Sequence, residues 1–159
     1  DVYKRQDRPR GGRRKGPTML IAIPLLLIPA VLYNIVVLFG GSGDGGVTQA
    51  DVLLRDPLFA VTMTSGAQWT IGSGDLILFL GLILLFFELL KSTSSQRVAI
   101  VNHALSMILF IGVLIEFLLL PGFATSTFFL IVTMILLDVL AGFIVTIVAS
   151  RKDLDFGGA

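Results

Sequence analysis

The sequence contains no cysteine and few charged residues, since Lys, Arg, Asp and Glu make up only 14% of its 159 residues. The absence of cysteine excludes disulfides, thiol catalysis, zinc–thiolate sites and Cys-ligated iron–sulfur clusters. A soluble domain typically has about 25% charged residues, so this chain carries too little charge to cover a water-facing surface. With 55% hydrophobic residues and a mean hydropathy of +0.91, it is predicted to be an integral membrane protein.

The positive charge is concentrated at the start of the chain, where seven of the twelve basic residues lie within the first fifteen positions. Residues 1–6 resemble a translated sequencing adapter, and residues 7–18 resemble read-through of GC-rich DNA. We interpret residues 1–18 as mostly artefact, with a native start at Met19. The alternative is a basic cytoplasmic tail. Without these residues, which include seven basic and two acidic ones, the net charge changes from +1 to −4.

Four apolar stretches are each long enough to cross a bilayer as a helix, which takes about 20 residues. They cover about residues 19–40, 71–90, 98–120 and 127–150. Residues 19–155 are therefore predicted to form one all-α, polytopic bundle of four transmembrane helices. Prolines in the first stretch are compatible with this fold, because neighbouring helices can satisfy the backbone groups that they leave free.

The basic residues near the ends of the spans predict the orientation of the bundle. Lys91, Arg97, Arg151 and Lys152 fall on one side of the membrane, and only Arg55 falls on the other. Cytoplasmic loops of membrane proteins carry the excess of Lys and Arg. Both termini are therefore predicted to be cytoplasmic, with the long first loop outside.

This outer loop, residues 41–70, contains several local signals. A short helix is predicted to begin near Thr48 and to end before Pro57. Leu58–Met63 is predicted to be extended or to lie on the membrane surface. Trp69 directly precedes the second span and is predicted to anchor it at the headgroup level. The loop is either a plain connector or a lip that docks another membrane subunit.

Several polar side chains fall within the predicted spans. A charge at the bilayer centre costs about 2.5–3.5 kcal/mol on insertion scales, so such residues need a partner, water or a function. The candidate embedded or proton-relay residues are Asn34, Glu88, Asn102, His103, Glu116 and Asp138. The sequence lacks the common phosphate-binding, nucleophile-elbow and HExxH motifs. We therefore expect no enzyme, no metal and no cofactor.

Helical spacing indicates local roles for some of these residues. Glu88 precedes Lys91 by three positions, which predicts an ion pair at the membrane edge. His103 is the only histidine, and a hydrogen bond to Glu88 or Ser106 is predicted for it. At 100° per residue, one face of the third span collects Asn102, Ser106, Leu109, Val113 and Glu116.

Asp138 lies near the middle of the fourth span, with no basic residue within a turn of it on its own helix. It is therefore predicted to be protonated or to pair with Asn34, Asn102 or water. Gly142, one turn further along the same face, is predicted to let a neighbouring backbone approach closely. Asp138 is the embedded residue for which a functional role is most strongly indicated.

Several segments resemble a group of small bacterial inner-membrane proteins with four predicted spans, a group without an assigned activity. These segments are SGAQWTIGSGDLILFLGLILLFFELLKST at 65–93, VNHALS at 101–106, EFLLLPGFATSTFFL at 116–130 and DVLAGFIVTIVASRKD at 138–153. The resemblance implies a location in the bacterial inner membrane and a four-span architecture. It transfers no catalytic residue to this chain.

Three functions are consistent with these observations. The first is a non-enzymatic structural or accessory subunit, which packs its helices against a second copy or a membrane-protein partner and binds no nucleic acid. The second is a small proton or cation conductor or transporter subunit. Asp138 would then be its central site, Glu116 an outer relay, and His103 with Glu88 an inner relay. The third is a haem- or quinone-associated redox subunit that uses His103.

Overall fold

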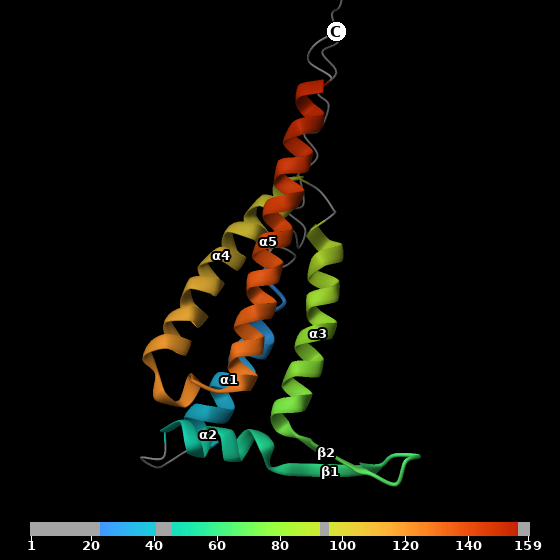
Figure 1. Cartoon of the computed structure of the whole chain (residues 1–159). Helices are drawn as coiled ribbons and strands as arrows, with labels where there is room; N and C mark the ends of the chain where they lie inside the picture. The colour runs from blue at the N-terminus through green and yellow to red at the C-terminus, as the bar shows by residue number, and fades with distance from the viewer. Residues whose placement is uncertain (1–22, 41–45, 93–95, 156–159) are drawn as a thin grey trace, which may run out of the picture.

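The computed structural model describes residues 23–40, 46–92 and 96–155, and the predicted tail at residues 1–18 lies outside them. Four helices run side by side, and one short helix and a β-hairpin lie across one end of the bundle (Figure 1). The elements are α1 (Leu27–Gly40), α2 (Gly46–Arg55), β1 (Pro57–Thr62), β2 (Gln68–Gly72), α3 (Ser73–Ser92), α4 (Gln96–Leu119), the 3-10 turn η2 (Pro121–Phe123) and α5 (Ser126–Asp155).

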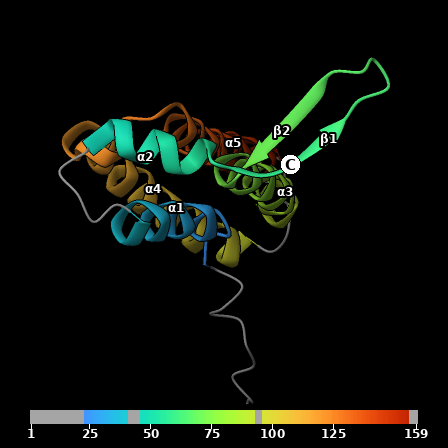
Figure 2. The same ribbon diagram turned by 90° about the horizontal axis from the view of Figure 1, so that it is seen from below.

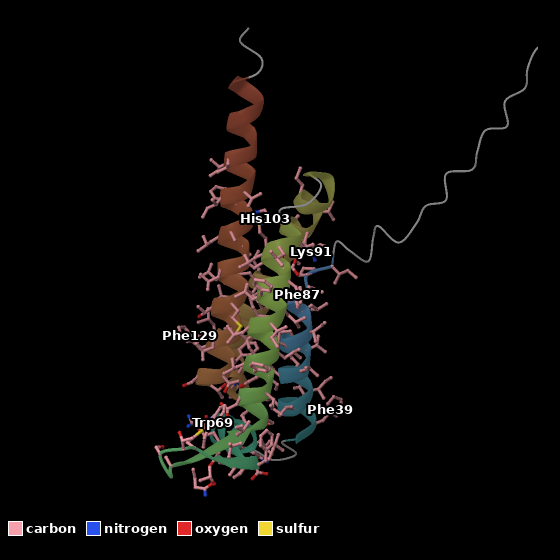
Figure 3. All side chains as sticks on the ribbon, turned by 90° about the vertical axis from the view of Figure 1, so that its right-hand side faces the viewer. Phe39, Trp69, Phe87, Lys91, His103 and Phe129 are labelled. Carbon is pink, nitrogen blue, oxygen red and sulfur yellow. The ribbon has the colours of Figure 1, made fainter. Side chains whose placement is uncertain are left out.

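Three of these helices are long and apolar enough to cross a bilayer. The qualifying segments are Ser73–Lys91 in α3, Ile100–Leu119 in α4 and Ser126–Val145 in α5. They confirm the last three predicted spans, and α5 continues five residues beyond the predicted end at 150. Large apolar side chains such as Phe39, Phe87 and Phe129 project from the outside of the bundle (Figure 3). These features indicate a membrane protein.

The first predicted span is shorter in the structure than the sequence suggested. Helix α1 begins at Leu27 and has 14 residues, which is about 21 Å at 1.5 Å per residue. Pro24 lies in the turn that precedes it, and Pro29 lies in its first turn, where a backbone N–H would have no helical partner. The predicted residues 19–22 are outside the described part of the chain. A full-length fourth span is therefore not confirmed.

The loop between α1 and α3 contains the short helix that the sequence predicts and a hairpin that it does not. Helix α2 ends just before Pro57, as predicted, and begins slightly ahead of Thr48. The predicted extended segment forms β1, which pairs antiparallel with β2 from Thr62 opposite Gln68 to Pro57 opposite Gly72. This pairing was not predicted.

The apolar core lies between α1, α3, α4 and α5, and its largest fully buried side chains, Tyr33, Phe123 and Phe128, lie at or near η2. Tyr33 of α1 packs against Phe123 and Phe128, with ring centroids 5.5 and 4.6 Å away. Its hydroxyl donates a hydrogen bond to the Gly122 carbonyl at 3.1 Å and also hydrogen-bonds with the hydroxyl of Thr125. The short helix α1 is thus fixed to the start of α5.

Candidate functional site

A fully buried carboxylate, Glu88, joins three parts of the bundle. Its Oε1 accepts hydrogen bonds from the Asn102 amide of α4 and from Lys91 Nζ, which is 2.9 Å away. Its Oε2 accepts the backbone N–H of Leu25 at 2.7 Å. The predicted Glu88–Lys91 ion pair is confirmed. However, Glu88 is enclosed by protein and does not lie at an exposed edge.

The same ion pair holds the beginning of α1. The first N–H groups of a helix have no partner within the helix, and the N-terminal end of its dipole attracts negative charge. Glu88 lies near this end of α1 and accepts the N–H of Leu25 in the preceding turn, while Lys91 Nζ donates to the Ile23 carbonyl at 2.8 Å. The turn that leads into α1 is therefore bound by one acidic and one basic side chain of α3.

A second group of buried polar atoms surrounds Asp138, and we call it the Asp138 site. Asp138 on α5 is buried, and Ser106 and His103 of α4 lie beside it. Ser106 interacts with the Asp138 carboxylate, while Asn102 Oδ1 and His103 Nδ1 are buried and make no hydrogen bond within the described residues. Buried polar atoms are usually paired, so this is the part of the described bundle where buried polar side chains are least well satisfied.

His103 differs from its predicted role. Its Nδ1 is bonded to neither Glu88 nor Ser106. Its ring packs against Gly142, where an added methyl group would collide with Nδ1. The close neighbour that Gly142 admits is therefore a side chain from α4 and not a backbone segment. His103 and Lys91 lie toward the same end of the bundle, opposite Trp69 (Figure 3).

Asn34 and Glu116 form a separate pair near the other end of the bundle. Asn34 Nδ2 donates to Glu116 Oε2 at 3.2 Å and to the Ala30 carbonyl at 3.0 Å. The predicted alternative of an Asn34–Asp138 pair is therefore wrong. The pair lies at a cavity of about 220 Å³ between α1 and α4, which is lined by Leu27, Ala30, Val31, Asn34, Leu109, Gly112, Val113 and Glu116.

The predicted polar face of the third span is confirmed on α4. Asn102, Ser106 and Val113 are buried, and Leu109 and Glu116 are half-buried. Helical phase did not show that this face meets two partners: its first turns face α3 and α5, and its last turns face α1. The predicted polar ladder is thus divided into two clusters, one around Glu88 and Asp138 and one at Asn34 and Glu116.

Sequence reasoning did not assign roles to Tyr33 and Thr125, which link α1 to the start of α5. Only the apolar run around Tyr33 suggested that its hydroxyl would need a partner. Within the described residues, no three His, Asp or Glu side chains are grouped so that they could hold a metal ion. Comparisons with protein-family models, curated proteins and solved structures give no match.

Proposed function

We propose that the chain is a non-enzymatic accessory protein of the bacterial inner membrane, which acts by packing its helices against a membrane-protein partner or a second copy. The observation that carries this proposal is the cavity between α1 and α4. There the Asn34–Glu116 pair and the open surface of Gly112 face a space that no side chain of the described residues fills. Small residues and polar pairs are characteristic of helix–helix contacts within membranes.

In this proposal α1 is a fourth crossing, and both termini are cytoplasmic. Counted from the start of α3, Glu88 lies about 22 Å along the helix at 1.5 Å per residue. The hydrocarbon core of a bilayer is about 30 Å thick. The turn before α1, which Glu88 binds, is therefore within about 8 Å of the cytoplasmic side of that core. Ile23–Leu26 and the residues before them can cover that distance. The distribution of basic residues supports this orientation, because cytoplasmic segments carry the excess of Lys and Arg. The proposed cytoplasmic side has Lys91, Arg97, Arg151 and Lys152, and the outer side has Arg55.

Photo-cross-linking tests the accessory role, because the chain has no cysteine of its own. A benzophenone maleimide attached to Gly112→Cys is expected to give one discrete cross-linked product in native membranes, of twice the chain's mass or of the mass of a partner complex. The matched control is Phe79→Cys, at an exposed position on α3, which should give lipid adducts only. If both variants give the same products, the α1–α4 surface is not an assembly site.

A proton or cation conductor is the second candidate, and the Asp138 site favours it. The Asp138 carboxylate is buried, and Ser106 and His103 of α4 lie beside it. A buried carboxylate between two helices can take up a proton or a cation. This function requires that flux depends on the Asp138 carboxylate.

We do not propose the haem or quinone role. The His103 ring packs against Gly142 of α5 so closely that a methyl group would not fit between them. A planar cofactor on that face of the ring would have to separate α4 from α5.

A further inference from the structure

The β1–β2 hairpin presents an exposed apolar face. Residues 57–72 contain no charged side chain, and every residue from 57 to 70 is exposed. The large exposed ones are Leu58, Phe59, Val61, Met63 and Trp69, with exposed fractions of 41–56%. Successive residues of a strand point to opposite faces, and directly paired residues of two strands share a face. Phe59 pairs with Ile71 and Val61 with Trp69, so these apolar side chains lie on one face. The other face carries Thr62, Gln68 and Thr70.

The apolar side chains of this hairpin are not covered by any other part of the described chain. A two-stranded hairpin is marginally stable by itself in water, and contiguous exposed apolar surface marks a contact with a membrane or another protein. The hairpin extends away from the bundle when viewed along the helices (Figure 2).

The root of the hairpin is firmly fixed to the end of α3. Strand β2 ends at Gly72 and α3 begins at Ser73, with no connecting residue. The Gly72 N–H donates to Asp75 Oδ2 at 2.9 Å, and Ser73 Oγ donates to the Leu53 carbonyl of α2 at 3.1 Å. A Cβ on Gly72 would lie 2.6 Å from the Leu54 carbonyl oxygen. This close approach of α2 sets the direction in which the hairpin leaves.

That direction places the hairpin along the membrane surface. The hairpin projects at a steep angle to α3, beside α2, which also lies across this end of the bundle (Figure 1). Because Ser73–Lys91 is long and apolar enough to cross a bilayer, its first residue lies near the lipid–water boundary. A hairpin that starts there and runs across the helix axis lies in the plane of this boundary.

We infer that the β1–β2 hairpin is embedded in the boundary between headgroups and acyl chains of the bilayer that α3 crosses. Trp69 and Phe59 supply the aromatic side chains that favour this depth. The face that carries Phe59, Val61 and Trp69 is then covered by acyl chains, and the face that carries Thr62, Gln68 and Thr70 meets headgroups and water. With no charge in residues 57–72, the attraction comes from apolar burial and does not require anionic lipid. The inference goes beyond the accessory role and depends only on α3 crossing the membrane.

Trp69 makes a direct test practical, because it is the only tryptophan in the chain. The full chain is reconstituted in phosphatidylcholine vesicles, and Trp69 fluorescence is quenched by lipids brominated near the headgroup or near the chain end. Shallow bromines are expected to quench at least about twofold more than deep ones, as for a ring at the interface. Adding phosphatidylserine or salt should leave this ratio unchanged, because salt screens only charge interactions.

Phe59 on β1 allows two further variants, one that moves the tryptophan probe and one that removes an apolar side chain. Trp69→Phe combined with Phe59→Trp moves the probe to β1 and should give the same preference for shallow bromines. Phe59→Ser should increase quenching of Trp69 by aqueous iodide while helix content, measured by circular dichroism, stays the same. Iodide quenching as strong as for free N-acetyltryptophanamide would place the hairpin in water and overturn the inference. Quenching by neither iodide nor lipid would show protein cover and would overturn it as well.

Discussion

Replacing Glu88 with alanine is expected to lower the free energy of unfolding by about 3–5 kcal/mol, the usual cost of removing one partner of a buried ion pair. The change leaves the ammonium of Lys91, the amide of Asn102 and the N–H of Leu25 without their shared acceptor. It should therefore release the start of α1 as well as weaken the contact between α3 and α4. The measurement is loss of helical circular dichroism on titration of detergent-solubilised protein with dodecyl sulfate.

The exposed ion pair of α2 supplies the matched control. Arg55 Nε lies 2.8 Å from Asp51 Oδ2, with side chains 72% and 39% exposed. Exposed helical pairs of this spacing contribute only about 0.3–0.5 kcal/mol, so Asp51→Ala should have little effect. Glu88→Met combined with Lys91→Met should recover part of the lost stability, because it removes both buried charges together. Equal effects of Glu88→Ala and Asp51→Ala would show that Glu88 is not a structural junction.

If the chain conducts protons or cations, replacing Asp138 with asparagine is expected to reduce flux in proteoliposomes to the level of empty vesicles. Asparagine keeps the size and shape of the side chain, but its amide is uncharged and cannot take up a proton or bind a cation as the carboxylate does. The expected effect is therefore a loss of flux with helix content retained. Dye-detected proton flux and tracer cation uptake measure it.

Asp51→Asn is the control for this experiment, because it also removes one carboxylate but lies on α2 away from the Asp138 site. It should keep the flux of the unmodified chain. Flux that persists in Asp138→Asn, or its absence from the unmodified chain, would contradict the conductor role. Either result would leave the accessory role in place.

Hydropathy was sufficient to predict α3, α4 and α5, because a bilayer imposes a length on each crossing helix. It did not show that the helix of the first stretch begins only at Leu27, after a turn at Pro24 that Glu88 and Lys91 bind. Those two contacts connect residues 63 and 68 positions apart. A local sequence pattern cannot reveal contacts between residues that are so far apart in the chain.

The hairpin and the polar clusters also depend on contacts that a local sequence pattern does not show. Leu58–Met63 was recognisable as extended, but its pairing with β2 depended on a turn in which Gly66 adopts a φ of +84°. A glycine within a short polar stretch between two apolar runs was the available signal. Helical phase correctly placed Asn102, Ser106 and Glu116 on one face. It could not tell that Asn102 meets Glu88 while Glu116 meets Asn34, because the packing of the other helices decides this.

The fourth crossing by α1 is most directly tested by labelling single introduced cysteines with a membrane-impermeant maleimide. Asp56→Cys, at an exposed position beside the hairpin, is predicted to react on intact cells. Ser94→Cys and Thr18→Cys, both made in the full 159-residue chain, are predicted to react only after the membrane is permeabilised. If Thr18→Cys reacts on intact cells together with Asp56→Cys, α1 does not cross the membrane and the four-span account is wrong.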